Sequence, residues 1–443
     1  MSGARPSGRP HVLYVAWGFP PMAAGGTFRT LATANVMADS GFDVTVLTTT
    51  RESFLGLVGV DDALLDQIDP RIEVVRIPFE GPVRRWDIRR WSKGRATDPD
   101  GWQKVHDDEP GFPEAVFGGW HEPLIAAAER IHAKRRVDLV VGSANPHVVL
   151  SAGDHLHQLH GVPYVIDHRD AWRLNCYLGI ESHTDKPKVA ELETRYMTHA
   201  HEIWFVNEAI RQWHQQLYPE VADRMRVVEN GYDRQFAPRP RLEPRPTKGP
   251  LVFSYVGSLS TRAPVEEFVE GWIRARERSP LMADAVANLY GPLNGGGDAR
   301  RRLVADAAEH GVIHHGPVSK TDVAAVYEEA DALLLILAGG RFVTSGKVYE
   351  YLSSALPVVS VHDPSNGAAE VLDGYPLWFR NADLTPDGIA DALIATAERA
   401  RSATADERNA CRDFASSSER YERLRDPVRE LLHAISSGKQ VSA

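Results

Sequence analysis

The chain has 443 residues, more than one compact core usually holds, so two domains are expected. Its net charge of −10 argues against a molecule built as a whole to bind nucleic acid. The spacing of the two cysteines, Cys176 and Cys411, suits neither a zinc site nor a disulfide framework and favours a reducing compartment such as the cytoplasm. No apolar run reaches the length of about 18 residues that a membrane-spanning helix needs. Residues 1–10 lack the apolar core of a secretory signal and predict a disordered tail.

Apolar runs of strand length recur through the first half of the chain and alternate with helical patterns. These runs are His11–Ala16, Asp43–Thr48, Ile72–Ile77, Val137–Val141, Pro163–Asp167 and Glu202–Val206. In the first helical pattern, Phe28, Leu31 and Ala38 share one face, and Gly41 ends it. Such alternation favours a parallel sheet covered by helices on both faces, which we place in a first domain over residues 11–237.

Residues 238–250 interrupt this alternation with five prolines. Such a segment cannot continue a helix or a sheet and predicts a stiff, extended linker. The alternation restarts at Leu251–Val256 and predicts a second doubly wound domain over residues 251–417. From residue 418 the chain is helical and charged. A cleft between two such domains is a favoured ligand site.

Residues 81–113 do not fit the alternation. They contain Trp86 and Trp91, and residues 84–95 carry six cationic side chains against the single acid Asp87. The segment is compatible with an ordered loop that has a solvated basic face. It is also compatible with a flap that binds an acceptor, or with a patch that touches anionic lipid.

A short helix is predicted between the apolar runs 332–337 and 357–361. Ser345 is a good N-cap, so the helix starts near it and Lys347 falls in the first turn. The helix dipole disfavours a cation there, and an anion bound at this helix end would remove the conflict. The pattern therefore indicates a phosphate site with Glu350 one turn further along. The alternative is a Lys347–Glu350 surface ion pair at i, i+3.

Two other chemistries are disfavoured. The loop at residues 17–26 does not have the G-x-G-x-x-G spacing, and residues 48–51 offer no acid to bond a ribose hydroxyl, which argues against a nicotinamide dehydrogenase. His155, His157 and His160 do not share a helix face, so no metal site is predicted there.

Five motifs, taken together in their order and spacing, resemble the retaining GT-B glycosyltransferases of glycosyltransferase family 4. They are Gly25-Gly26, Asp167–Trp172, Glu229–Asp233, Tyr255–Leu259 and Gly346–Leu352. The resemblance runs from about His11 to Tyr421. It implies two Rossmann-like domains facing a central cleft, with residues 418–443 returning to the first domain. It also implies sugar transfer, with retention, from a nucleotide diphosphate sugar that binds mainly to the second domain, while the acceptor binds mainly to the first.

The resemblance assigns roles in the second domain. Glu350 matches the glutamate that bonds the donor ribose hydroxyls. Lys347 and the helix start at Thr344-Ser345-Gly346 would hold the diphosphate. Arg262, in the loop after Gly257-Ser258, matches a second cation for the diphosphate, although taken alone it is compatible with a surface residue. Backbone around Val318 would meet the base.

In the first domain, the resemblance implies that Gly25 and Gly26 let backbone approach the donor phosphate or sugar, because glycine has no Cβ. His168 and Asp170 would contact the transferred sugar. From the residues alone, the glycine pair is also compatible with a simple turn, and His168 with a hydrogen-bonded core histidine. On the acceptor side we expect Arg169 and Trp172, together with Trp86 and Trp91.

One position departs from the family pattern. Many members carry a second, sugar-binding glutamate seven residues before the one matched here, whereas this chain has Val343. The transferred sugar is therefore less predictable, and backbone from Gly339-Gly340 is the alternative contact.

The expected mechanism follows from charge. Lys347, Arg262 and the helix start would stabilise the leaving diphosphate, so neither a metal nor a cofactor is expected, and His168 completes the residues assigned to catalysis. We expect front-face attack, with the leaving phosphate taking the acceptor proton. The acidic balance favours a small soluble acceptor, whereas residues 84–95 keep a lipid-linked one open. A GT-B sugar-nucleotide epimerase, a glycan phosphorylase and a non-catalytic nucleotide-sugar-binding protein are the competing interpretations.

Overall fold

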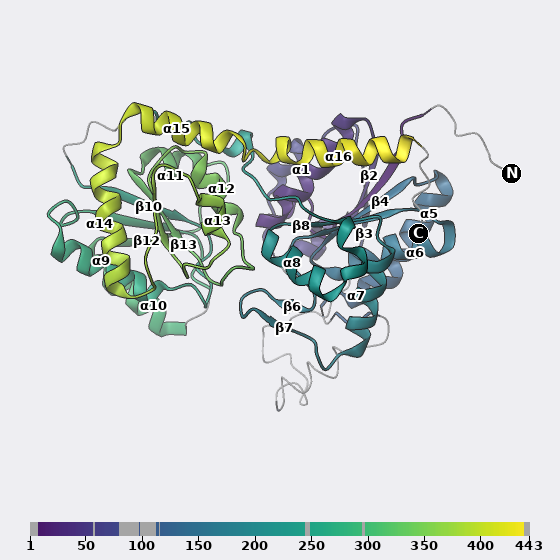
Figure 1. Cartoon of the computed structure of the whole chain (residues 1–443), viewed down its shortest axis with the longest axis horizontal. Coiled ribbons are helices and arrows are strands. Elements are labelled where there is room, and N and C mark those ends of the chain that lie inside the picture. Colours follow the sequence, from purple (N-terminus) through teal and green to yellow (C-terminus); the bar gives the residue numbers. More distant parts are fainter. Residues whose placement is uncertain are drawn as a thin grey trace. The chain divides into compact units, whose positions relative to one another are not determined.

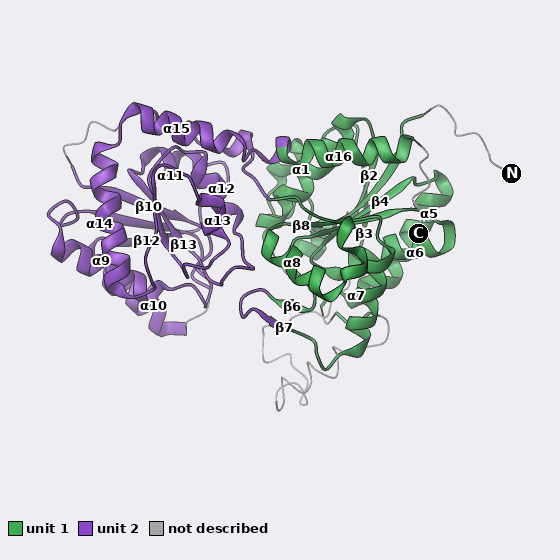
Figure 2. Cartoon of the chain, viewed as in Figure 1, with its two compact units in different colours: residues 1–175, 181–229, 423–443 green, residues 176–180, 230–422 purple. Residues whose placement is uncertain are grey.

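The computed structural model describes residues 8–55, 58–78, 97, 112–114, 116–243, 249–294 and 297–437. Trp86, Trp91 and the basic segment 84–95 lie outside the described residues, as do residues 1–7 of the expected tail. The chain forms two compact units. Figure 2 shows unit 1, which is Met1–Asn175, Glu181–Glu229 and Arg423–Ala443, in green, and unit 2, which is Cys176–Ile180 and Asn230–Glu422, in purple.

Unit 1 is built on a seven-stranded parallel sheet of order β3-β2-β1-β4-β5-β8-β9. The strands are β1 His11–Val15, β2 Asp43–Thr49, β3 Glu73–Ile77, β4 Leu139–Ala144, β5 Tyr164–His168, β8 Glu202–Phe205 and β9 Met225–Val227. Every residue of β1, β4 and β5 is buried, as expected for central strands with helices on both faces.

The helices of unit 1 alternate with these strands (Figure 1). They are α1 Gly25–Ser40, α2 Arg51–Leu55, α5 His121–Lys134, α6 Leu150–His160, α7 Pro187–His199 and α8 Glu208–Leu217. The first long helix ends at Gly41, whose φ of 113° is left-handed, as the sequence predicted. The short strands β6 Leu174–Asn175 and β7 Ile180–Glu181 pair with each other.

The last helix, α16 Arg420–Ser436, belongs to unit 1 from Arg423 onward. Glu430 pairs with Arg226 of β9 at 2.6 Å, and the side chain of Leu432 lies against Gly41. The predicted return of the C-terminal helix to the first domain is confirmed. Among the described residues, no helix combines the length and the apolar character that a bilayer span requires.

Unit 2 is built on a six-stranded parallel sheet of order β12-β11-β10-β13-β14-β15. The strands are β10 Val252–Val256, β11 Val286–Tyr290, β12 Val312–Gly316, β13 Ala332–Ile336, β14 Val358–Val361 and β15 Trp378–Phe379. The helices are α9 Val265–Arg278, α10 Gly297–Asp306, α11 Val323–Glu329, α12 Gly346–Leu352, α13 Ala368–Leu372, α14 Pro386–Ser402 and α15 Ala405–Ser416.

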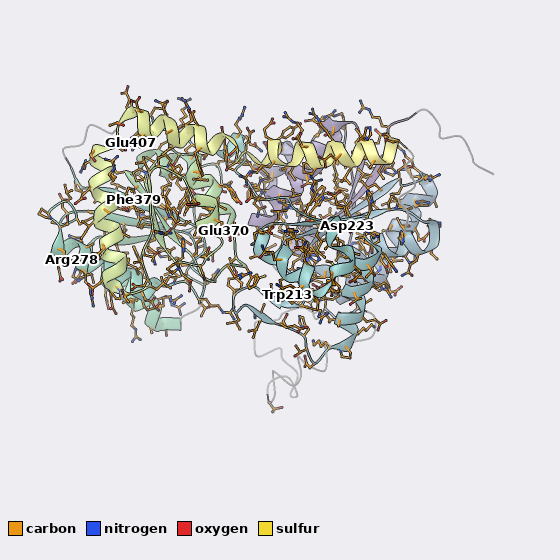
Figure 3. All side chains as sticks on the ribbon, viewed as in Figure 1. Trp213, Asp223, Arg278, Glu370, Phe379 and Glu407 are labelled. Atoms are coloured by element: carbon orange, nitrogen blue, oxygen red, sulfur yellow. The ribbon has the colours of Figure 1, made fainter. Side chains whose placement is uncertain are left out.

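Strand β13 explains why helices cover both faces of this sheet. Leu334 and Ile336 point into the core that includes α9 and α14, whereas Leu333 and Leu335 point into the core that includes α11 and α12. Successive side chains of a strand alternate between faces, so an uninterrupted apolar run must be covered twice. Side chains fill the space between the sheet and the helices in Figure 3.

Two helix contacts in unit 2 are marked by residues labelled in Figure 3. Arg278 in the last turn of α9 pairs with Asp391 of α14 at 2.5 Å. Glu407 completes a capping box with Thr404 at the start of α15. The capping box defines where α15 begins, the exposed ion pair adds little, and the apolar cores supply most of the stability.

The strand order reverses direction once in each sheet. In unit 1 the chain moves outward from β1 to β3 and then from β4 to β9 on the other side. In unit 2 it moves from β10 to β12 and then from β13 to β15. The loops that follow the two central strands therefore diverge at the carboxyl edge, where open α/β sheets bind ligands. The two-domain doubly wound fold predicted from the sequence is confirmed.

Candidate active site

Helix α12 follows β13 at the reversal point of unit 2 and begins where the sequence predicted. Ser345 is its N-cap, and its Oγ accepts a 3.4 Å hydrogen bond from the backbone N–H of Lys347. Helix α12 thus begins at Gly346, directly after the expected N-cap.

The side chain of Lys347 turns inward instead of pairing with Glu350. Its Nζ donates to Tyr255 Oη at 2.7 Å and lies 4.2 Å from the centroid of that ring. The Tyr255 hydroxyl in turn donates to the carbonyl oxygen of Ser258 at 2.9 Å. In the part of the chain that the structure describes, no carboxylate lies within ion-pair distance of Lys347. The alternative of a Lys347–Glu350 surface pair is therefore wrong.

Gly257 makes room for this cation. It follows β10 directly and has a φ of 144°, and a Cβ built on it would lie 2.4 Å from Lys347 Nζ. Burial lowers the pKa of Lys347 to about 8, an effect that the charge of Glu350 partly opposes. A half-buried cation without a carboxylate partner is destabilising, and an anion bound beside it would relieve that strain on the fold.

Glu350 is paired with a residue that the sequence did not single out. Its Oε1 accepts from Lys320 Nζ at 2.5 Å, and its Oε2 accepts from Tyr327 Oη at 3.4 Å. Lys320 lies in the loop between β12 and α11, two residues beyond the half-buried Val318. The loop expected to meet the base and the expected ribose ligand are therefore adjacent in unit 2.

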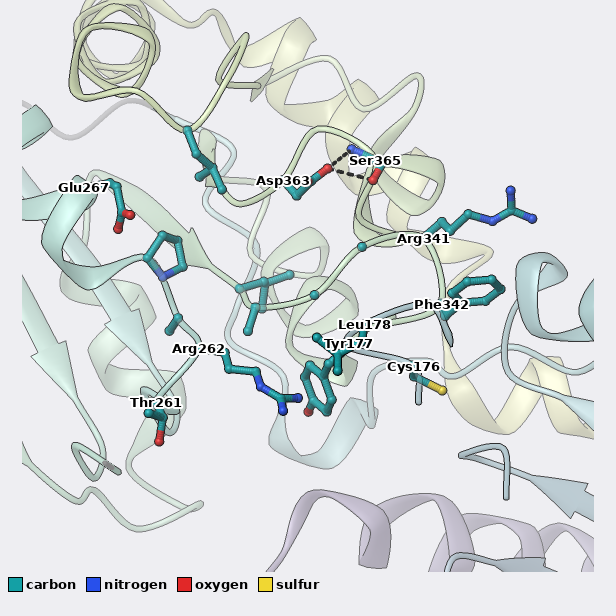
Figure 4. A pocket seen from close by; sticks show the side chains of 18 of the residues that line it. Cys176, Tyr177, Leu178, Thr261, Arg262, Glu267, Arg341, Phe342, Asp363 and Ser365 are labelled. Atoms are coloured by element: carbon teal, nitrogen blue, oxygen red, sulfur yellow. Dashed lines mark hydrogen bonds between the residues drawn. The ribbon is translucent and has the colours of Figure 1, made fainter. Parts of the chain in front are cut away.

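A cavity of about 690 Å³ lies at the carboxyl edge of the same sheet (Figure 4). Its walls are the loops after β10, β13 and β14, the first turn of α9, Arg300 of α10, Leu384 and residues 176–179. Arg262 borders it, with the guanidinium carbon 5.2 Å from the ring centroid of Tyr177, and Gly339 and Gly340 form part of the wall. Lys347 and Glu350 do not line this cavity, so Arg262 belongs to a neighbouring part of the edge.

Asp363, one of the acids in the cavity wall, is held by its own loop. Asp363 Oδ1 accepts from the backbone N–H of Ser365 at 2.8 Å and from its hydroxyl at 2.7 Å, as the dashed lines in Figure 4 mark. These bonds lower the pKa of Asp363. Ser258, at the start of the loop after β10, is exposed, and its Oγ accepts from Asn294 Nδ2 at 2.7 Å.

In unit 1, the structure brings the glycine pair and Arg169 together. Helix α1 begins at Gly25, and its N-cap, Ala24, offers no side-chain hydrogen bond. A Cβ at Gly26 would lie 1.8 Å from Arg169 Nη1, whereas nothing lies within 4 Å of one at Gly25. The Arg169 Nε donates to the Ala144 carbonyl at 3.0 Å, which ties the side chain to the end of β4.

His168, the last residue of β5, is buried inside an aromatic cluster and is only 1% exposed. Its ring stacks on Phe205 at 5.5 Å, and its Nδ1 lies 3.4 Å from the carbonyl oxygen of Asp170. Burial, with smaller effects from His214 and His147, places its pKa well below the ordinary value, so the imidazole is neutral at pH 7. The side chain of Asp170 is exposed.

Trp172 is also buried rather than presented to solvent. Its ring stacks on His147 at 4.9 Å and on Phe112 at 5.3 Å, with interplanar angles of 5° and 9°. At 4% exposure it packs the end of the sheet. A role for Trp172 in acceptor binding stays a prediction. Because the ring is buried, Trp172 would influence an acceptor only by positioning His147 and Phe112.

The motif that contains Asp167 is anchored by a residue that the sequence did not reveal. Arg29 of α1 pairs with Asp167 at 2.7 Å, and the two side chains are 1% and 0% exposed. The Arg29 Nη1 also donates to the carbonyl of Glu229 at 3.2 Å. The sequence offered one signal for a buried Arg29: its neighbours within the helix are small or apolar. In the described ranges, no group of three His, Cys, Asp or Glu side chains could hold a metal ion.

Comparison with known proteins agrees with this geometry. Residues 24–231 match the family model of the glycosyl transferase 4-like domain, and residues 250–399 match that of glycosyl transferases group 1. No curated protein sequence matches the chain.

Solved structures share the fold at low identity. Sucrose-phosphate synthase from Thermosynechococcus elongatus is 14% identical, with a TM-score of 0.65 over 97% of this chain and 100% of that one. HepE of Anabaena, solved in complex with UDP, is 13% identical, with a TM-score of 0.62 over 96% of this chain and 100% of that one. A glycosyltransferase from Rickettsia africae is 12% identical, with a TM-score of 0.65 over 97% and 100%.

Two doubly wound units, each matched by a glycosyltransferase domain, define a GT-B enzyme that uses nucleotide sugars. The chain belongs to glycosyltransferase family 4, in its group 1 type, a family of retaining enzymes.

Proposed function

We propose that this enzyme transfers a sugar, with retention and without a metal ion, from a UDP-sugar to a small soluble acceptor. The observation that carries the proposal is the half-buried Lys347 at the reversal point of the second sheet, which lacks a carboxylate partner among the described residues. UDP is favoured because HepE, which shares the fold, was solved with UDP and with UDP-glucose.

The donor is divided among the groups of unit 2. Lys347 and the backbone of Thr344-Ser345-Gly346 bind the diphosphate, and Glu350 bonds the ribose. The base lies against backbone near Val318. The sugar lies toward Arg262. Backbone of Gly339-Gly340 contacts it there, in place of the glutamate that many family members have where this chain has Val343.

The groups of unit 1 serve the sugar and the acceptor. Gly25-Gly26 opens the start of α1 to an anionic or hydroxyl oxygen, beside Arg169. His168 is neutral and buried, so it acts on the sugar only through Asp170, whose carbonyl oxygen lies 3.4 Å from its Nδ1. Asp170 has an exposed carboxylate able to accept from a sugar or acceptor hydroxyl.

The chemistry is a substitution at the anomeric carbon. The bond between that carbon and the β-phosphate oxygen breaks, and its electron pair leaves with the phosphate. The acceptor oxygen forms a bond on the same face and gives its proton to the leaving phosphate oxygen. Lys347 and Arg262 stabilise the developing charge, and each such donor contributes on the order of 3 kcal/mol.

A lipid-linked or cell-envelope acceptor is the second candidate. Residues 84–95 carry six cations, and the fold is shared with WaaG, described as a glycosyltransferase of lipopolysaccharide biosynthesis, at 14% identity and a TM-score of 0.57. Sedimentation with anionic vesicles at low and high salt separates the two candidates. Binding that high salt abolishes favours the envelope acceptor, and non-binding at both salt concentrations favours the soluble one.

The proposed donor is tested by thermal shift with UDP, GDP, ADP and dTDP, because a ligand at about 100 times its Kd stabilises the folded state by about 2.7 kcal/mol. We expect UDP to give the largest shift and Lys347→Met to abolish it. Lys134→Met, which removes a 77% exposed lysine of unit 1, is the matched control. Turnover of UDP-sugars with an acceptor should continue in excess EDTA.

Three outcomes would overturn the proposal. Clean isomerisation of the donor without an acceptor favours an epimerase, and tight binding without turnover of any donor favours a binding protein. Loss of transfer in EDTA that Mg²⁺ restores would contradict metal independence.

A further inference from the structure

The partner of Glu350 is Lys320, which lies thirty positions earlier in the chain. The two side chains are 17% and 24% exposed, and the Nζ–Oε1 distance is 2.5 Å. The contact therefore lies in a sheltered part of unit 2, where a charged hydrogen bond is stronger than at an open surface. It joins the loop after β12 to helix α12.

The other neighbours restrain both members of the pair. The hydroxyl of the buried Tyr327 donates to the second carboxylate oxygen of Glu350 at 3.4 Å. Lys320 Nζ also lies 5.9 Å from the ring centroid of Phe236. The carboxylate is thus held by one donor on each oxygen.

Lys320 also interacts with a second acid, Asp233. Asp233 is buried and pairs with Arg420 at 2.9 Å. Burial raises the pKa of Asp233, the charges of Arg420 and then Lys320 lower it, and the charge of Glu350 raises it. Lys320 therefore lies near two acids, and without it Glu350 would face Asp233 with less compensation.

The two hydrogen bonds do not exhaust the acceptor capacity of Glu350. A carboxylate offers about four lone-pair positions, and Lys320 and Tyr327 occupy one on each oxygen of Glu350. One position remains on each oxygen, so Glu350 can accept two further hydrogen bonds. A ribose diol has two hydroxyls and can donate both. The ion pair therefore need not break when the ribose binds.

We propose that Lys320 is a positioning residue for donor recognition, which orients Glu350 so that both of its oxygens bond the ribose diol. The inference rests on the proposed function, because it takes Glu350 as the ribose ligand. It adds that Lys320 sets the preference for ribose over 2′-deoxyribose. Lys320 itself does not touch the reacting atoms.

The experiment measures the dissociation constants of UDP, GDP and ADP and of their 2′-deoxy counterparts by calorimetry. The comparison uses the base whose ribonucleotide binds the wild-type chain most tightly. A hydrogen bond to a charged group is worth tenfold or more in affinity, so we expect the wild-type chain to prefer ribose by about tenfold. The variants are Lys320→Met, Lys320→Arg, Glu350→Gln and the double variant Lys320→Met with Glu350→Gln.

In Lys320→Met we expect the ribose preference to fall to about twofold, with the deoxynucleotide affinity nearly unchanged. Lys320→Arg should restore most of the preference, because it keeps the charge. The double variant should bind no more weakly than Glu350→Gln, because Lys320 acts through Glu350. A thermal melt of each variant, with Lys134→Met as the control, verifies folding.

The outcomes distinguish this inference from the proposed function. If Glu350→Gln removes the ribose preference and Lys320→Met does not, the inference is overturned and the donor site stands. If Lys320→Met weakens ribo- and deoxynucleotides equally, Lys320 binds another part of the nucleotide, and the inference is again overturned. If neither Glu350→Gln nor Lys347→Met changes any affinity, or if no ribonucleotide binds, the proposed donor site fails.

Discussion

Replacing Lys347 with methionine should separate function from stability. Methionine has a similar length and fills the same space beside Tyr255 without carrying a charge. The native cation is held with a pKa of about 8, below its ordinary value of 10.5, chiefly because of burial. That lowering corresponds to roughly 3 kcal/mol of unfavourable free energy in the charged folded state at pH 7.

The change also removes one hydrogen bond, from Lys347 Nζ to Tyr255 Oη, which is worth about 1 kcal/mol. The Tyr255 hydroxyl keeps its bond to the Ser258 carbonyl, so no buried donor is left unpaired. We therefore expect Lys347→Met to be as stable as the wild-type chain or more stable by up to about 2 kcal/mol, which is a few degrees in Tm. Sugar transfer should nevertheless fall by about 100-fold or more, because one fixed donor to the leaving phosphate is lost.

The pH dependence gives an independent readout of the same residue. Between pH 8 and 10.5 the unfolded chain holds a proton on Lys347 that the folded chain has released, so this residue makes stability rise with pH across that window. The stability advantage of Lys347→Met should therefore shrink as the pH is raised from 7 to 10. The affinity of the wild-type chain for UDP should fall above about pH 8, where the free cation is lost, and the variant should lack that step.

Calorimetry, a donor-turnover assay and melts at several pH values check these expectations, with Lys134→Met as the matched control. Transfer retained within a factor of two would refute the assignment of Lys347 to the diphosphate. A variant that loses activity only in proportion to a loss of several degrees in Tm would show that the residue is structural. Either result would remove the physical basis of the proposed donor site.

Two further predictions concern other parts of the site. Gly26→Ala should lower transfer by at least tenfold, because its Cβ would displace the Arg169 guanidinium. A Cβ at Gly25 has nothing within 4 Å, so Gly25→Ala should act only through backbone freedom and change transfer less than threefold. Equal effects of the two variants would contradict the reasoning. Cys176 and Arg262 both line the cavity, whereas Cys411 is buried with its pKa raised to about 11, so a maleimide should modify Cys176 first. UDP-glucose should slow that modification and UDP alone should not; equal protection by both would place the nucleotide, not the sugar, in the cavity.

The sequence was sufficient for the fold because the fold depends on local periodicity. Runs such as 12–16 and 332–337 are apolar without interruption, and only a sheet covered on both faces buries such runs. The start of α12 was predicted for the same reason, since an N-cap is a property of the residue and its neighbours.

The partners within the site were not accessible from the sequence. Spacing along a helix suggested Lys347 as the partner of Glu350, but the lysine side chain packs on Tyr255 and the glutamate pairs with Lys320 from another loop. His168 was correctly expected at the end of a strand, yet its burial depends on Phe205 from another element. Long-range packing decides such pairs, and spacing within one helix carries no information about it.

Each unit places a glycine against a cation near the carboxyl edge of its sheet. In unit 2, Gly257 follows β10, the strand at the reversal point, and Lys347 from the element after the neighbouring β13 lies under it. In unit 1, Gly26 is the second residue of α1, the helix that comes after β1, and Arg169, which follows β5 and is bonded to the end of β4, lies against it.

In each unit a missing Cβ lets a cation sit against backbone at the carboxyl edge. Neither Lys347 nor Arg169 has a carboxylate within ion-pair distance among the residues that the structure describes. A cation kept close to main chain without a counter-ion is unfavourable in the free protein, so its retention in both units favours binding of an anion or of an oxygen that becomes one during reaction. This argues that the arginine would serve the reacting oxygens in the way proposed for the lysine. The cation it accommodates requires glycine at position 26, and at position 257 the φ of 144° requires it as well.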